Sequence, residues 1–126
     1  MLIKTMGLAW VSVKDVAQAK QFFVETLGLT MASGSDEYGW MELVAADQGF
    51  RLGVGACHDA GQPVQPGNNA VVTMTVDDVV AAKKTLEGRG VQFVGDIVEV
   101  PGHVKMIFFK DVDGNYFHLV QMLSDQ

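Results

Sequence analysis

The sequence predicts an α+β protein built from two tandem βαβββ units, whose strands form a curved, cup-like mixed β-sheet with the helices outside. The first observation is a strand-and-helix pattern at 8–20 that recurs half a chain length later at 71–83. The second is a match between the closing strands, because Phe50-Arg51-Leu52 corresponds to Phe117-His118-Leu119. Self-similarity over half the chain indicates two copies of one supersecondary unit.

The third observation is a stretch rich in Gly, Pro and Asn between the two copies. This composition is typical of a connecting loop. We therefore divide the single predicted domain into a first unit at 1–56, a linker at 57–69 and a second unit at 70–126.

The first unit is predicted to begin with a strand at 7–14, in which apolar residues alternate. Asp15 is a good N-cap for a helix whose apolar stripe runs through Ala19 and Phe23, and Gly28 ends that helix. Strands are then expected at the following segments: 29–34, 38–44 and 50–55.

The second unit repeats this order from about Ala70. Asp77 and Asp78 cap its helix, which ends at Gly88-Arg89-Gly90. The remaining strands are expected at these segments: 91–99, 103–110 and 115–121. A sheet with one helix layer buries one face and leaves the other face bare. Two bare faces that curve towards each other, or towards a second chain, would leave a cleft for a ligand.

Composition excludes several classes of partner. The net charge of −6 argues against nucleic acid and against an anionic membrane surface. The sequence has no apolar run long enough to span a membrane and no signal-peptide pattern. A single cysteine, Cys57, rules out an internal disulfide framework and fits a cytoplasmic location.

Three runs in the right order resemble the vicinal oxygen chelate superfamily, which includes glyoxalase I, extradiol dioxygenases, fosfomycin resistance enzymes and bleomycin-binding proteins. They lie at 13–29, 76–91 and 109–120, and the last departs from the usual D-P-D-G-N only at Val112. The resemblance covers nearly the whole chain. It implies the paired βαβββ fold and often a homodimer, but one fold hosts many activities.

The resemblance also implies where a metal would be held, at the first and last strands of each unit. Those positions are occupied here by Leu8, Arg51, Val71 and His118. Only His118 has a side chain that ligates a divalent ion, and such an ion needs about three protein donors. We therefore expect no metal and no other cofactor at the usual site.

Strand alternation identifies the side chains that share the cleft face with those four positions. The predicted ligand-binding residues are Trp10, Ser12, Trp40, Arg51, Thr73, Tyr116 and His118. Aromatic walls with few polar groups suit a planar or aromatic small molecule. Arg51 and His118 are related by the repeat and are expected to approach each other across the cleft. Arg51 could clamp an anionic group or simply pair with Glu42.

The leading hypothesis is a metal-independent binding protein of the bleomycin-resistance type, which works as a homodimer and sequesters a drug or metabolite. The alternative is an enzyme, a lyase, isomerase or dioxygenase with a divalent ion at a displaced site of His103, His118 and Glu42. In an enzyme His118 is the best catalytic candidate, as an acid or base near neutral pH. A third reading is an interaction domain whose cleft is filled by its own side chains.

Overall fold

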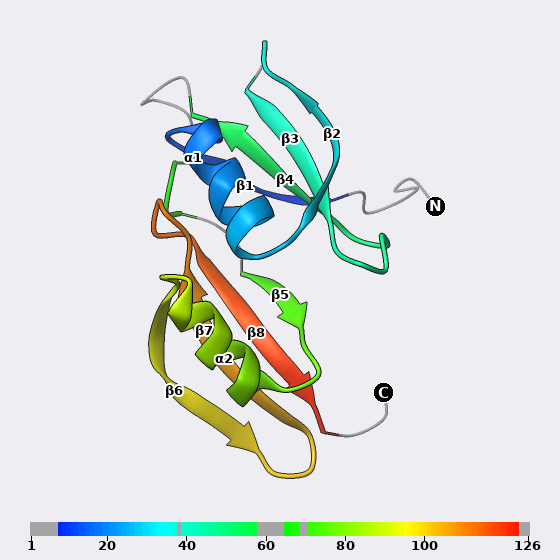
Figure 1. Ribbon diagram of the computed structural model, residues 1–126, viewed down its shortest axis with the longest axis vertical. Coiled ribbons are helices and arrows are strands. Elements are labelled where there is room, and N and C mark those ends of the chain that lie inside the picture. The colour runs from blue at the N-terminus through cyan, green and yellow to red at the C-terminus, as the bar shows by residue number, and fades with distance from the viewer. Residues whose placement is uncertain (1–7, 38, 58–64, 69–70, 124–126) are drawn as a thin grey trace, which may run out of the picture. The chain divides into compact units, whose positions relative to one another are not determined.

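The computed structural model describes residues 8–37, 39–57, 65–68 and 71–123. The chain forms two compact units, Met1–Ala70 and Val71–Gln126, and each contains one four-stranded mixed sheet with helix on one side (Figure 1). The α+β class and the two βαβββ units are therefore confirmed. Most of the linker expected at 57–69 lies outside the described residues.

The first unit has the strand order β1-β4-β3-β2, in which β1 runs parallel to β4 and the other pairs are antiparallel. Its elements are β1 (Ala9–Val13), α1 (Val16–Lys20), η1 (Gln21–Thr26), β2 (Thr30–Ser35), β3 (Trp40–Val44) and β4 (Arg51–Ala56).

The second unit repeats this topology with the order β5-β8-β7-β6, and β5 is parallel to β8. Its elements are β5 (Val72–Thr75), α2 (Val79–Gly88), β6 (Gln92–Val100), β7 (Val104–Lys110) and β8 (Tyr116–Met122). No helix in the described part of the chain is long and apolar enough to cross a membrane.

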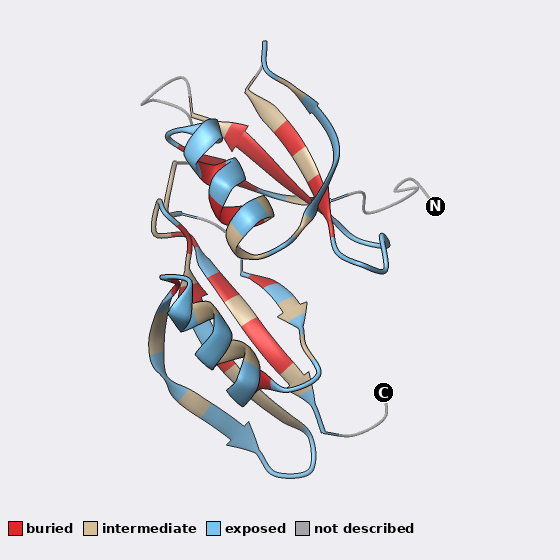
Figure 2. Cartoon of the chain, in the orientation of Figure 1, coloured by how far each residue is buried: buried red, intermediate tan, exposed pale blue. Residues whose placement is uncertain are grey.

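Each unit buries one face of its sheet beneath its helix. In the first unit Val11, Val54 and Phe23 are completely buried. In the second unit Phe109 and Phe117 are also completely buried, and their rings stack with centroids 5.5 Å apart. Figure 2 shows the buried positions as stripes along the central strands, whereas the outer surface of α2 and much of the edge strands β2 and β6 are exposed. The period-two alternation of the strands separates these buried positions from an outer face.

The first helix changes its winding after one turn, which the sequence pattern did not predict. The backbone N–H of Leu27 donates to the carbonyl of Phe22 at 3.0 Å, and Gln21–Thr26 forms a π-helical turn. Phe22 and Phe23 are consecutive, yet both are buried, and their rings meet edge to face at 5.2 Å. The wider π turn reduces the angle between neighbouring side chains, so that both rings reach the core.

The helix ends agree with the capping signals in the sequence. The carboxylate of Asp15 accepts hydrogen bonds from the backbone N–H groups of Ala17 and Gln18, and that of Asp78 accepts one from Ala81. These bonds satisfy donors that have no partner inside a helix. Gly28 follows η1 with a φ of 84°, a left-handed conformation that glycine adopts without a steric penalty.

The β7–β8 turn is held by a buried carboxylate. Asp111 accepts hydrogen bonds from the backbone N–H groups of Asp113 and Asn115 and from the Asn115 side-chain amide, at 2.8–2.9 Å. Burial raises the pKa of the Asp111 carboxyl, and the hydrogen bonds from Asn115 and Asp113 oppose that shift. The D-V-D-G-N run in the sequence is thus a structural turn that fixes the start of β8.

Replacing Asp111 with Ala should lower the free energy of unfolding by about 2 kcal/mol, because buried donors lose their acceptor. The measurement is urea denaturation followed by circular dichroism. Asp96→Ala is the matched control, since Asp96 is exposed in the same unit. Equal stability of the two variants would contradict this role for the turn.

Candidate functional site

The outer face of the first sheet carries most of the residues that the sequence assigned to a ligand site in this unit. The strand register pairs Trp10 with Gly53 and Gly53 with Glu42, so these positions form one row across β1, β4 and β3. The next row consists of Ser12, Gly55 and Trp40. Paired residues point to the same side of a sheet, and this side is opposite to the one that α1 and η1 cover.

Trp10 and Trp40 lean over the two glycines of β4 and form what we call the tryptophan platform, defined as Trp10 and Trp40 above Gly53 and Gly55. The two indole rings meet edge to face, with centroids 5.9 Å apart. A Cβ atom built at Gly53 would lie 2.5 Å from Cη2 of Trp40 and 2.8 Å from Cβ of Trp10. The platform therefore exists only because β4 has no side chain at this position.

A polar pair borders the platform. Glu42 accepts a hydrogen bond from the Trp40 indole Nε1 at 3.0 Å and forms an ion pair with Arg51 Nη1 at 2.9 Å. The hydrogen bond from Arg51 and then that from Trp40 lower the pKa of the Glu42 carboxyl, so it stays ionised at neutral pH. The pairing of Arg51 with Glu42, which the sequence left open, is present in the structure.

The exposure of these side chains differs. Trp10 is 36% exposed, and the side chain of Arg51 is 46% exposed, so both are accessible on the surface of their own unit. Ser12 shares the outer face but is completely buried. Its assignment as a ligand contact stays a prediction, as do the assignments of the other site residues.

The outer face of the second sheet has a different character. Thr73, His118 and Phe108 form one row across β5, β8 and β7, and the His118 ring stacks on Phe108 at a centroid distance of 4.5 Å. Tyr116 meets Phe108 edge to face at 6.4 Å. Burial lowers the pKa of His118, so this imidazole is neutral at pH 7. The approach of His118 to Arg51 across a common cleft stays a prediction, because each residue is described within its own unit.

The donor set does not fit the metal site of the superfamily. Leu8 and Val71 offer only hydrocarbon, and the guanidinium of Arg51 is already paired with Glu42. Within the described residues, no three His, Cys, Asp or Glu side chains come close enough to hold an ion. The alternative trio of Glu42, His103 and His118 stays a prediction, because Glu42 belongs to the first unit and the two histidines belong to the second. His103 lies in the turn before β7, where its carbonyl accepts a hydrogen bond from the backbone N–H of Leu123.

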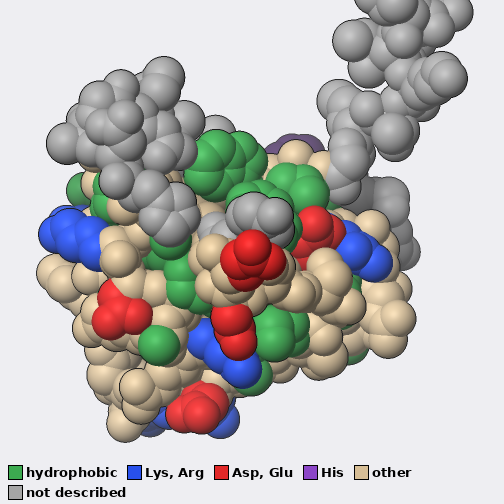
Figure 3. All heavy atoms as spheres, turned by 90° about the horizontal axis from the view of Figure 1, so that it is seen from above, with side chains coloured by type: hydrophobic (Ala, Val, Ile, Leu, Met, Phe, Trp, Pro, Cys, Tyr) green, Lys and Arg blue, Asp and Glu red, His purple; other side chains and the backbone are tan. Residues whose placement is uncertain are grey.

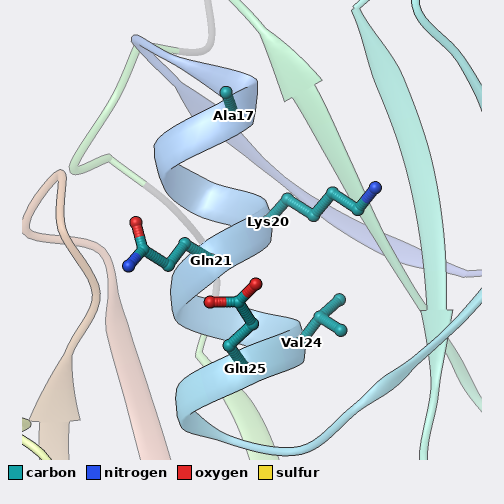
Figure 4. Close-up of a pocket in the computed structure, with 5 residues that line it drawn as sticks. All are labelled: Ala17, Lys20, Gln21, Val24 and Glu25. Carbon is teal, nitrogen blue, oxygen red and sulfur yellow. The ribbon is translucent and has the colours of Figure 1, made fainter.

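A surface hollow elsewhere in the first unit lacks the features of a ligand site. Figure 4 shows its lining side chains on one helix, with Lys20 and Gln21 extending in opposite directions. The lining residues are Ala17, Lys20, Gln21, Val24 and Glu25. All of them belong to the continuous helical segment formed by α1 and η1, so no strand or loop is among the lining residues. Figure 3 shows charges of both signs dispersed among hydrophobic side chains on the face that it displays, with no gathering of positive charge.

A family model described as the Glyoxalase/Bleomycin resistance protein/Dioxygenase superfamily matches residues 5–119. The chain belongs to this superfamily. Among curated proteins, YetH of Bacillus subtilis (strain 168) is 27% identical over 121 residues, which cover 94% of this chain and 98% of YetH.

Two solved structures have the same architecture. TnmS3, an antibiotic-binding protein from Streptomyces sp. CB03234, superposes with a TM-score of 0.79 at 28% identity, covering 97% of this chain and 98% of TnmS3. A superfamily member from Sphaerobacter thermophilus DSM 20745 has a TM-score of 0.78 at 25% identity, covering 96% and 99% of the two chains.

Sequence reasoning assigned no part in the ligand site to three contributors to these faces, namely Gly53, Gly55 and Phe108. Gly53 and Gly55 form a Gly-x-Gly pattern within a predicted strand. This spacing indicates that bulky side chains of neighbouring strands approach the backbone closely on one face. Phe108 is not among the residues that the sequence predicts for the ligand site. The register pairs Phe108 with His118 directly.

Gly53→Ala should displace the Trp40 ring, because the new methyl group would occupy the same space. We expect a changed near-ultraviolet circular dichroism spectrum and a loss of about 1–3 kcal/mol in the free energy of unfolding. Gly88→Ala is the control, since nothing lies within 4 Å of that position. An unchanged tryptophan signal in Gly53→Ala would show that the ring does not lie on β4.

The lowered pKa of His118 predicts a pH dependence of stability. A histidine whose pKa is lower in the folded than in the unfolded protein favours folding at pH values above the unfolded-state pKa of about 6.5. This contribution is lost as the pH falls through the folded-state pKa. The free energy of unfolding should therefore decrease more steeply between pH 7 and pH 5 in the parent protein than in His118→Gln. Denaturation curves across this range provide the measurement, and identical slopes would contradict the assignment.

Proposed function

We propose that this protein binds a planar or aromatic small molecule without a metal ion and sequesters it. The tryptophan platform is the observation that carries this proposal. Two indole rings on a sheet face supply a large apolar surface with defined stacking geometry, and they lose little conformational freedom on binding. Arg51, which borders the platform, would orient a polar substituent of the ligand.

The chemistry of the chelating positions supports binding rather than metal-assisted turnover. The hydrocarbon side chains of Leu8 and Val71 remove two of the four metal ligands. The third position carries a guanidinium, that of Arg51, which is paired with Glu42 and cannot bind a cation. Similarity to TnmS3 points in the same direction, because TnmS3 binds an antibiotic and shares 28% identity over nearly the whole chain. A homodimer and a cytoplasmic location belong to the same proposal.

A panel of simple probes tests the proposal directly. Proflavine is planar and cationic, pyrene sulfonate is planar and anionic, and adamantane carboxylate is bulky and not planar. Binding of either planar probe should quench tryptophan fluorescence, whereas the adamantane compound should have little effect. Native mass spectrometry of the freshly purified protein would identify a molecule that copurifies.

Replacing Trp10 or Trp40 with Ala should weaken binding of the planar probes by about tenfold, because each variant removes one stacking surface. Phe50→Ala is the matched control, since Phe50 is an aromatic residue in the turn before β4 and is 53% exposed. Isothermal titration calorimetry measures the affinities, and circular dichroism confirms the fold.

Two results would overturn the proposal. One is equal affinity of the parent protein for planar and non-planar probes. The other is a stoichiometric metal ion in the purified protein that His118→Ala removes, which would favour the enzyme.

A further inference from the structure

We propose that Glu42 is a positioning residue, which holds the Trp40 indole in place above the glycines of β4 and thereby preforms the surface that a planar ligand meets. This inference rests on the proposed function, since it assigns to Glu42 a role in the same site. Glu42 itself need not touch the ligand, because it acts through Trp40.

The geometry of the carboxylate supports this role. Oε2 accepts from the Trp40 indole on the same strand, whereas Oε1 accepts from Arg51 on the neighbouring strand β4. Both oxygens are therefore engaged, and the carboxylate cannot rotate without breaking a charge-assisted hydrogen bond. The ion pair with Arg51 thus holds the Glu42 carboxylate in place, and this carboxylate in turn holds the N–H of the Trp40 indole.

The glycines of β4 constrain the other side of the same ring. The edge of the Trp40 ring lies where side chains at Gly53 and Gly55 would stand, with Cε3 of Trp40 only 3.1 Å from the Cβ position of Gly55. The six-membered ring of the indole thus occupies the space above the two glycines, and the indole N–H is held by Glu42. A ring fixed in this way loses less conformational entropy when a ligand stacks on it.

The second unit shows that this arrangement is not a general feature of the repeat. Trp10 corresponds to Thr73 in the repeat, so the register places His118 where the first unit has Gly53 and Phe108 where it has Glu42. His118 leaves no room for an indole above the strand, and Phe108 has no atom that accepts a hydrogen bond from one. The carboxylate, the two glycines and the tryptophan therefore occur together in one unit only.

The experiment uses Trp10→Phe as the parent, so that Trp40 is the remaining one of the two tryptophans. Glu42→Gln keeps an oxygen that can accept from the indole but removes the charge, whereas Glu42→Leu has a similar shape and no acceptor. Time-resolved fluorescence anisotropy reports the local motion of Trp40, and titration with pyrene sulfonate and proflavine reports affinity. Glu99→Gln is the control, because Glu99 pairs with Lys105 at 4.0 Å on the second sheet.

We expect Glu42→Leu to increase the fast local depolarisation of Trp40 and to weaken binding of the planar probes by about tenfold. Glu42→Gln should weaken that binding by less than about threefold. The inference is overturned if Glu42→Leu leaves the motion of Trp40 unchanged, or if Glu42→Gln is as damaging as Glu42→Leu.

The two proposals fail in different ways. If the unsubstituted protein binds neither planar probe, the proposed function fails. The anisotropy comparison then still decides whether Glu42 positions Trp40. Urea denaturation of each variant separates loss of positioning from loss of the fold.

Discussion

Every feature of the candidate site depends on one constraint, the alternation of side chains across a sheet that has helix on one face only. Val11 and Val54 must point towards the helix, where they are completely buried. Trp10 and Gly53, their neighbours along the strands, therefore point the other way. Packing of the core thus determines which residues are displayed on the outer face of each unit.

The two units share their backbone plan but have diverged on these outer faces. Strand order, the parallel first-to-last pairing and the capping aspartates Asp15 and Asp78 are the same in both. In contrast, the first sheet displays indole rings over glycine, and the second displays an imidazole stacked on Phe108. Core positions are constrained by packing density, whereas outer positions are free to change with the ligand.

This divergence explains how the fold can remain recognisable while the donors of the usual metal site are replaced. The family model still matches residues 5–119. This range includes core, cap and turn residues such as Asp111 and Asn115. The chelating positions are few and lie on the outer faces. Hydrocarbon at two of them leaves the scaffold intact, and removes the lone pairs that a divalent ion needs.

The sequence by itself determined the order of the elements, the helix caps, the internal repeat and the sharing of one face by Trp10, Trp40, Glu42 and Arg51. These features follow from local signals, namely periodicity, capping residues and glycine. Only the tertiary structure decided that Trp40 fills the space above Gly53, that Glu42 joins Arg51 to the indole, and that a π turn buries both Phe22 and Phe23. Such contacts depend on strand register and on side-chain packing across strands, and no local pattern along one strand encodes them.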